Sequence, residues 1–148
     1  MKIVIETPKD GDEDEVIIRC RELNDDLMEL ISRLRTDRIF ITGHSEGMIK
    51  RLSPKDVYYF EAVDNKVFVY LEKDVYEVKE KLYEIEEHYR HTDLQRISKS
   101  VIVNISMIDH IAPLLGARLE ASLKNGEKLI ISRQYVPYLK KKLGISER

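Results

Sequence analysis

The apolar positions of the chain follow two different periods, and each period predicts its own kind of element. One group recurs at the i, i+3, i+4, i+7 spacing of an amphipathic helix: Leu27, Leu30, Ile31 and Leu34. Asn24 is the predicted N-cap of this helix, because its side-chain oxygen can accept a hydrogen bond from a free N–H of the first turn. Apolar and polar residues alternate in residues 1–6, and residues 16–20 begin with a short apolar run, so both segments are predicted strands. Residues 1–35 are therefore expected to form a β-β-α unit.

Short strands separated by turn signals dominate the middle of the chain. Strands are predicted over residues 38–42, 48–52, 57–63, 66–71 and 75–78. The third and fourth flank Asp64-Asn65, which tolerate positive φ and predict a hairpin with a two-residue loop. That loop pairs apolar residues on one face: Ala62 with Val67, Phe60 with Val69 and Tyr58 with Leu71. A second helix follows, with a predicted buried stripe of Val78, Leu82, Ile85 and Tyr89.

The last third of the chain contains a second hairpin signal, Asn125-Gly126. A two-residue loop there would place apolar Leu123 opposite Lys128. A three-residue loop instead pairs apolar residues: Ala121 with Leu129, and Leu119 with Ile131. We therefore predict a type I turn with Gly126 in the left-handed position. A final helix is predicted with these landmarks: Val136, Leu139 and Leu143 on its inward face, Pro137 in its first turn and Gly144 at its end.

Together these elements predict a mainly β fold for the 148-residue chain, in which antiparallel sheets carry two or three short helices. The N-terminal β-β-α unit and a linker strand are expected over residues 1–47, and the β domain over residues 48–148. No apolar run approaches the roughly 20 residues that span a bilayer, and Cys20 has no second cysteine to pair with. A cytoplasmic location is therefore expected.

The formal net charge of −2 is distributed unevenly along the chain. Residues 1–35 hold 6 Lys/Arg and 10 Asp/Glu, residues 36–90 hold 9 and 12, and residues 91–148 hold 10 and 5. The last third is thus basic against an acidic remainder. Such a surface either faces a polyanion or reflects chance segregation of solvated charges, and charge alone does not separate the two.

Motifs of catalysis and cofactor binding are missing from the sequence. It contains neither of the glycine-rich phosphate loops, GxGxxG and GxxxxGK(S/T), and no cysteine pair for zinc. His88 and His91, beside Glu84 and Glu87, are more typical of a solvated helix end than of a metal site. We therefore expect no enzymatic activity, no cofactor, no metal and no small-molecule substrate.

Three stretches together resemble the LytTR DNA-binding domain of bacterial transcription regulators: residues 56–61 (DVYYFE), residues 96–104 (RISKSVIVN), and Asn125-Gly126 with Ser132-Arg133 and the final helix. In the second stretch the family's usual run is Phe-x-Arg-x-His-Arg-Ser-x-x-Val-Asn. The chain keeps four of its residues: Arg96, Ser100, Val103 and Asn104. It has Leu94 for the Phe, Ser98 for the His and Lys99 for the Arg, so the family's base preference is not carried over.

The resemblance covers about two-thirds of the chain and implies an elongated arrangement of antiparallel sheets. Loops of such a domain, rather than a recognition helix, enter successive major grooves of double-stranded DNA. The chain looks like a stand-alone transcriptional regulator, because residues 1–47 are too few for the receiver domain that usual members carry. Some members of that branch are restrained by a small membrane protein, so the resemblance implies such a protein as a further partner.

The implied DNA contacts lie in three loops: Asn65 and Lys66, then Ser98, Lys99 and Ser100, then Arg133 and Gln134. Two further residues are predicted to be structural. Asn104 is expected to hydrogen-bond backbone at a strand end, and Arg96 to position its loop by pairing with a carboxylate such as Glu61. Two rival hypotheses are a protein-interaction module whose basic face binds an acidic partner, and a small-molecule hydrolase or transferase. Steep salt dependence of binding to duplex DNA separates the DNA-binding hypothesis from both, and a deep pocket with converging acids would favour the enzyme.

The apolar stripe of the N-terminal helix needs a covering surface, since two strands and one helix bury too little alone. Docking on the β domain and pairing with a second copy both satisfy it. We favour a homodimer, because two linked modules gain affinity on adjacent half-sites.

Overall fold

The computed structural model describes residues 2–35 and 40–145. Its larger sheet has seven strands in the order β2-β1-β5-β4-β3-β7-β6, and every pairing is antiparallel. The strands are β1 (Ile41–Ser45), β2 (Met48–Leu52), β3 (Tyr59–Val63), β4 (Lys66–Tyr70), β5 (Val75–Val78), β6 (Leu94–Arg96) and β7 (Val101–Asn104).

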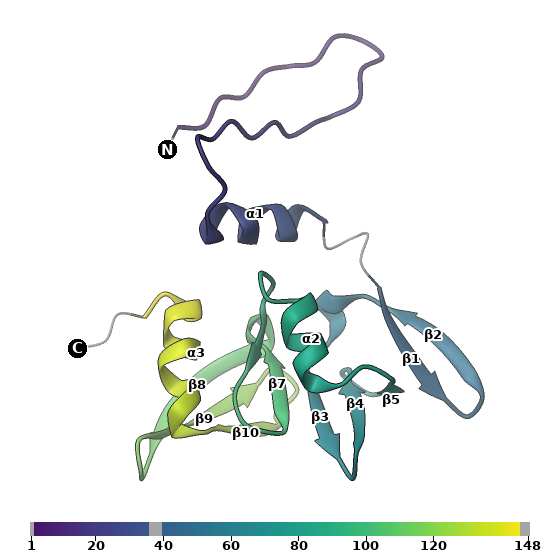
Figure 1. Ribbon diagram of the computed structural model, residues 1–148, viewed down its shortest axis with the longest axis vertical. Coiled ribbons are helices and arrows are strands. Elements are labelled where there is room, and N and C mark those ends of the chain that lie inside the picture. Colours follow the sequence, from purple (N-terminus) through teal and green to yellow (C-terminus); the bar gives the residue numbers. More distant parts are fainter. Residues whose placement is uncertain (1, 36–39, 146–148) are drawn as a thin grey trace.

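A smaller antiparallel sheet follows in the sequence, in the order β10-β9-β8. Its strands are β8 (Ile108–Leu114), β9 (Arg118–Leu123) and β10 (Lys128–Ile131). Three α-helices complete the described part of the chain: α1 (Asp25–Arg35), α2 (Leu82–His88) and α3 (Val136–Leu143). The mainly antiparallel β fold that the sequence predicts is confirmed (Figure 1).

Two hydrophobic cores are separated by strands β3 and β7. Phe60 and its cross-strand neighbour Ile102 lie in the first core, which is covered by Leu82 and Ile85 of α2 and by Tyr89 at the end of that helix. Val78, the fourth residue of the predicted helix stripe, is also in this core but belongs to β5, so its assignment to the helix was wrong. The adjacent pair, Tyr59 and Val103, lies in the second core, together with residues of the smaller sheet and of α3. Successive side chains of a strand point to opposite faces, so one pair of strands serves both cores.

The β3–β4 hairpin adopts the predicted register, in which the following residues are opposite: Phe60 and Val69, Ala62 and Val67. Asp64 and Asn65 both have the positive φ that the two-residue turn requires. The prediction was wrong for Tyr58, whose side chain lies in the second core. This residue follows the 3-10 turn Pro54–Asp56 and precedes β3, so the alternation of the strand begins only at Tyr59.

The β9–β10 hairpin also has its predicted register, in which the following residues are opposite: Ala121 and Leu129, Leu119 and Ile131. Gly126 has a φ of +90°, and its N–H donates to the carbonyl of Leu123 at 2.9 Å, which closes the turn. The final helix buries Val136 and Leu139 and ends at Gly144, whose φ is +75°. Both predictions for this part of the chain are confirmed.

The first strand differs from its predicted range. It was expected over residues 38–42, and β1 runs over Ile41–Ser45; residues 38 and 39 lie outside the described residues. The strand continues through Gly43, where a Cβ would lie only 2.8 Å from the Cβ of Tyr76. This glycine permits close packing against β5, and the turn between β1 and β2 consists of Glu46-Gly47 alone.

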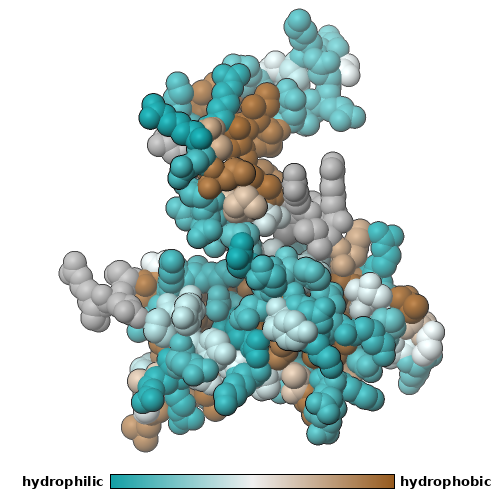
Figure 2. Space-filling model, in the orientation of Figure 1, coloured by the Kyte–Doolittle hydropathy of each residue, from teal (hydrophilic) through white to brown (hydrophobic). Residues whose placement is uncertain are grey.

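The N-terminal β-β-α prediction is only partly confirmed. Helix α1 forms, and Asn24 caps it by accepting a hydrogen bond from the N–H of Leu27 at 2.9 Å. The two predicted strands were wrong, because residues 2–20 contain no strand. An isolated two-stranded hairpin is marginal in water without a further strand or a packed helix. Leu30 and Leu34 of α1 are 42% and 52% exposed, and Figure 2 shows apolar side chains gathered over this helix.

Tyr59 makes contacts that connect the larger sheet to the smaller one. Its ring stacks on Tyr70 with the centroids 4.3 Å apart, and its hydroxyl donates to Oε2 of Glu127 at 2.7 Å. Burial, reinforced by the Glu127 carboxylate, raises the pKa of Tyr59 well above its ordinary value. The hydroxyl therefore keeps its proton and remains a donor, which holds the start of β10 against β3.

Candidate nucleic-acid interface

The loop between β6 and β7, residues 97–100, is held on both sides by backbone atoms. The N–H of Ser132 donates to the carbonyl of Ile97 at 2.9 Å, and the N–H of Ala62 donates to the carbonyl of Ser100 at 2.8 Å. Ala62 belongs to the β3–β4 hairpin, and Ser132 follows β10. The loop therefore lies between that hairpin and the junction of β10 with α3.

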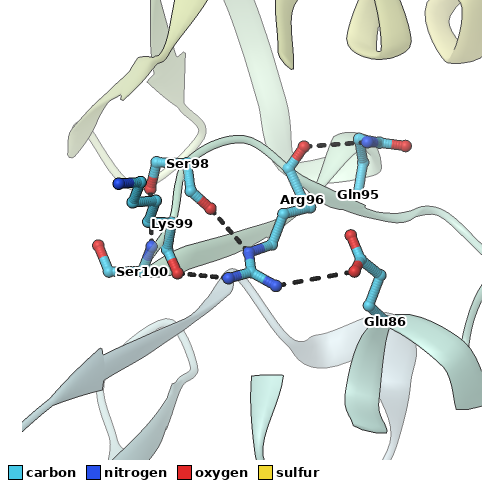
Figure 3. A network of polar contacts seen from close by, with 6 residues as sticks. All are labelled: Glu86, Gln95, Arg96, Ser98, Lys99 and Ser100. Atoms are coloured by element: carbon cyan, nitrogen blue, oxygen red, sulfur yellow. Dashed lines mark hydrogen bonds and ion pairs between the residues drawn. The ribbon is translucent and has the colours of Figure 1, made fainter. Parts of the chain in front are cut away.

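The Arg96 side chain donates hydrogen bonds to backbone carbonyls of the same loop (Figure 3). Its Nε donates to the carbonyl of Ser98 at 2.7 Å, and its Nη2 donates to the carbonyl of Lys99. Its Nη1 lies 3.7 Å from Oε1 of Glu86 on α2. The guanidinium thus connects two loop carbonyls to a helix, which is a geometry that a planar group with several donors can satisfy.

The predicted pairing of Arg96 with Glu61 was wrong. Glu61 faces Val101 across β3 and β7, on the side of the second core, and it accepts a hydrogen bond from the hydroxyl of Tyr70 at 3.3 Å. Arg96 faces Ile102 across β6 and β7, on the side that α2 covers. The two charged side chains lie on opposite faces of the sheet and cannot meet.

We expect Arg96→Lys to destabilise the protein by about 1–2 kcal/mol, because lysine cannot reproduce hydrogen bonds to both loop carbonyls. Thermal unfolding would measure this, and hydrogen exchange would show faster exchange of the Ser100 amide. Glu86→Gln is the matched control, since a half-exposed partner 3.7 Å away contributes little. An equal loss in both variants would mean that the ion pair, rather than the carbonyl contacts, positions the arginine.

The other two predicted loops flank the central one. Asn65 and Lys66 are exposed at the β3–β4 turn, and Arg133 and Gln134 are exposed in a 3-10 turn between β10 and α3. In Figure 1 the β3–β4 tip and the β10–α3 junction lie on the side of the β domain that faces away from α1. We call residues 64–66, 98–100 and 132–134 the loop face.

Cations dominate the exposed side chains of the loop face. Lys66, Lys99 and Arg133 are exposed there, against one exposed acid, Asp64. Ser98 adds a partly exposed hydroxyl beside Lys99. Ammonium, guanidinium and hydroxyl groups donate hydrogen bonds to phosphate oxygens and to base edges, so this arrangement is suited to contact nucleic acid. The structure brings all seven sequence-predicted contact residues to this one face.

Asn104 lies at the opposite end of β7 from the loop face and is 2% exposed. Its Nδ2 donates to the carbonyls of Val57 and Pro54 at 2.8 and 3.4 Å. Its Oδ1 accepts hydrogen bonds from the N–H and the hydroxyl of Ser106 at 3.1 and 2.7 Å. The backbone hydrogen bonds predicted for Asn104 are therefore present, and they join the end of β7 to the segment that enters β3.

Sequence analysis assigned no role in positioning the central loop to Glu86, Ala62 or Ser132. Glu86 carries a weak signal, because it is the acid next to the buried Ile85 on α2 and so lies at the margin of the helix face that meets the sheet. Ala62 and Ser132 act through backbone N–H groups, which every residue except proline has, so no side-chain pattern marks them.

Comparison with known proteins agrees with this arrangement. Residues 47–144 match the family described as the LytTr DNA-binding domain. The chain belongs to the LytTR family. The resemblance carried by its sequence motifs is thereby confirmed, and the LytTR match includes every residue of the loop face.

Curated relatives are similar to this chain over most of its length. The sensory transduction protein LytT of Enterococcus faecalis is 31% identical over 112 residues, which are 76% of this chain and 46% of that protein. The LytTR chain thus spans less than half the length of this relative. An uncharacterized HTH-type transcriptional regulator of Staphylococcus aureus is 25% identical over 130 residues, which are 86% of this chain and 88% of that protein.

A solved structure confirms the fold. It is the LytTr DNA-binding domain of a putative methyl-accepting/DNA response regulator from Bacillus cereus, with 29% identity and a TM-score of 0.66. The match covers 72% of this LytTR chain and 97% of that domain. Within residues 2–35 and 40–145, no helix has the length and apolar character needed to cross a membrane.

Proposed function

We propose that this LytTR chain regulates transcription by binding double-stranded DNA in a sequence-specific manner, with the loop face entering successive major grooves. The observation that carries the proposal is the joint placement of three cation-bearing loops in a chain matched by the LytTr DNA-binding domain. The names of the LytT proteins and of the Staphylococcus aureus regulator support a role in signal-dependent transcription.

The residues of the loop face suit different tasks on DNA. The Lys99 ammonium is a compact charge that suits a phosphate, whereas the Arg133 guanidinium can donate two hydrogen bonds to O6 and N7 of guanine. Gln134 and Asn65 carry amides, which can pair with adenine. Because backbone hydrogen bonds and Arg96 already fix the central loop, little conformational entropy is lost when it binds.

Two copies on adjacent half-sites complete the proposal. The apolar stripe of α1 is partly exposed, and a second copy is one surface that can cover it. Linked modules raise the effective concentration at the second half-site and so increase affinity without any new DNA contact.

Lys99→Ala should weaken binding to all duplexes by a similar factor and lower the slope of log K against log salt by about 1, because one phosphate contact is lost. Fluorescence anisotropy at several salt concentrations measures this. Lys73→Ala is the matched control: Lys73 is an exposed lysine in the β4–β5 turn, at the other end of β4 from the loop face.

A flat salt dependence of the unaltered protein on duplex DNA would argue against the proposed function. Capture of an acidic protein partner by the same basic surface would then be the better interpretation. Equal losses in the Lys99 and Lys73 variants would show that DNA attraction is spread over the whole surface rather than located on the loop face.

A further inference from the structure

Strand β2 is an unprotected edge of the larger sheet. It is the terminal strand, paired only with β1 among the described residues, and its first four residues are all exposed. Backbone groups alternate between partner and solvent along such a strand. In the register set by the Glu46-Gly47 turn, two residues of β2 direct their backbone N–H and C=O groups away from β1. These residues are Ile49 and Arg51. A free edge of this kind is a template for another strand.

Each of the other sheet edges has a feature, in or beside its outer strand, that hinders the addition of another strand. On β6, the carbonyl of Leu94 accepts a hydrogen bond from the Lys142 ammonium at 2.9 Å. On β8, Pro113 interrupts the row of donors. Beyond β10, the N–H of Ser132 is bonded to Ile97. Within the described residues, β2 has neither such a side-chain hydrogen bond nor a proline, and it exposes Met48 and Ile49, at 62% and 70%.

Residues 2–20 have strand-forming patterns but no strand to pair with. Ile3 and Ile5 are 85% and 91% exposed, and Val16 and Ile17 are 69% and 65% exposed. A turn with a hydrogen bond from the N–H of Asp12 to the carbonyl of Lys9 separates the two apolar runs. The segment therefore resembles a hairpin that lacks a third strand, and a third strand is what a hairpin needs for stability in water.

Charge makes β2 a complementary acceptor for this segment. Residues 2–20 hold three Lys/Arg and six Asp/Glu, with four acids in a row at residues 12–15. β2 contributes two cations and no acid. The Nζ of Lys50 lies 5.6 Å from the ring centroid of Tyr76, and the Cζ of Arg51 lies 4.0 Å from the ring centroid of Phe40.

We propose that residues 16–20 of one copy add to the β2 edge of a second copy as an antiparallel strand, and that the exchange is reciprocal. Antiparallel pairing places the acids of residues 12–15 toward Arg51 and Cys20 near Met48. The continuous apolar run at residues 16–18 suits a strand with neighbours on both sides. The alternating residues 2–6 form the outer strand, whose charged ends at Lys2 and Glu6 blunt the new edge.

A second copy, rather than the chain's own β2, is the occupant for two reasons. In one chain the N-terminal segment and β2 lie well apart, with α1 between them along the sequence (Figure 1). A reciprocal exchange also uses the same two surfaces on both copies and closes with two-fold symmetry, so both β2 edges are filled and no third copy is needed.

Cys20 provides a direct test, because it is the only cysteine and is exposed. The experiment uses two full-length variants, Met48→Cys and Arg51→Cys. For each variant, 15N-labelled and unlabelled copies are mixed and oxidised mildly. The disulfide-linked peptides are then identified by mass spectrometry. We expect a Cys20 disulfide to position 48 that combines labelled with unlabelled peptides. Position 51 is about 10 Å further along the strand and should cross-link at least ten-fold less.

Three results would overturn the proposal. A disulfide to position 48 that never mixes labels would show docking within one chain. Cross-linking at position 51 but not at 48 would exclude the antiparallel pairing. Absence of both disulfides, with a monomer in sedimentation at tens of micromolar, would show that β2 takes no strand from a second copy.

Ile49→Pro is the second variant, because it removes an outward N–H while the ladder between β1 and β2 keeps its hydrogen bonds. Sedimentation equilibrium of the full chain should show at least a ten-fold weaker dimer, with unchanged circular dichroism. Ile49→Val is the control and should dimerise like the unaltered protein. Equal dimerisation of the proline and valine variants would assign the contact to another surface, such as the α1 stripe.

Discussion

Replacement of Asn104 by alanine is expected to lower the free energy of unfolding by about 1–3 kcal/mol. The side chain is buried and joins two carbonyls on one side to Ser106 on the other. Alanine leaves the carbonyl of the fully buried Val57 and the N–H of Ser106 without these partners. For a domain of this size, each kcal/mol corresponds to a fall in melting temperature of about 2–4 °C.

Ser106→Ala is the matched control for Asn104. It removes one side-chain hydrogen bond and leaves the Asn104 amide bonded to Val57, Pro54 and the Ser106 N–H, so its cost should be smaller. DNA preference should not change in either variant, because Asn104 lies at the far end of β7 from the loop face. An unchanged melting temperature combined with lost binding would make Asn104 a contact residue and contradict the structural role.

Arg133→Ala is expected to cost about 1–3 kcal/mol of specific binding energy, which is a loss of roughly 5- to 150-fold in affinity, and to relax base preference at one position of the site. Arg133 is exposed, and its neighbour Ser132 is fixed by the backbone bond to Ile97, so the arginine extends from a rigid base. Selection from random duplexes with each variant measures both effects.

Arg133→Lys separates the two tasks that an arginine can perform on DNA. Lysine keeps the charge and loses the planar pair of donors, so it should retain affinity for random duplexes but not the preference at that position. A uniform loss over all sequences in Arg133→Ala, with full recovery in Arg133→Lys, would assign Arg133 to a phosphate instead. Circular dichroism of both variants should match the unaltered protein.

The sequence predicted local registers well because turn chemistry and apolar pairing point to the same answer. Only a three-residue loop at Gly126 puts Leu119 and Ala121 opposite apolar residues, and the structure has that loop. The same agreement held for the Asp64-Asn65 turn. Where one of the two signals was missing, as at the start of β1 and at Tyr58, the predicted range or face was wrong.

Contacts between elements were harder to predict than the elements themselves. The positioning role of Arg96 followed from the motif, but its partner depends on which face of the sheet α2 covers, and Glu86 rather than Glu61 lies on that face. The N-terminal strands failed for a related reason. The local sequence pattern favours an extended backbone in residues 2–20, but a stable strand needs a neighbouring strand. Within one chain, no described strand lies beside this segment.

The placement of the central loop depends on main-chain atoms of Ala62, Ile97, Ser100 and Ser132 rather than on the side chains that face outward. Main-chain hydrogen bonds survive most substitutions, so Ser98, Lys99 and Arg133 can change identity while the bonds of the loop to Ala62 and Ser132 remain. Under the proposed function, Ser98 and Lys99 of residues 96–104 contact DNA, whereas Arg96 and Asn104 of the same run support the fold. Such separation lets a family diverge in target sequence by changes at the tips alone, and it lets an engineer vary positions 98, 99 and 133 together while Arg96 and Asn104 are kept.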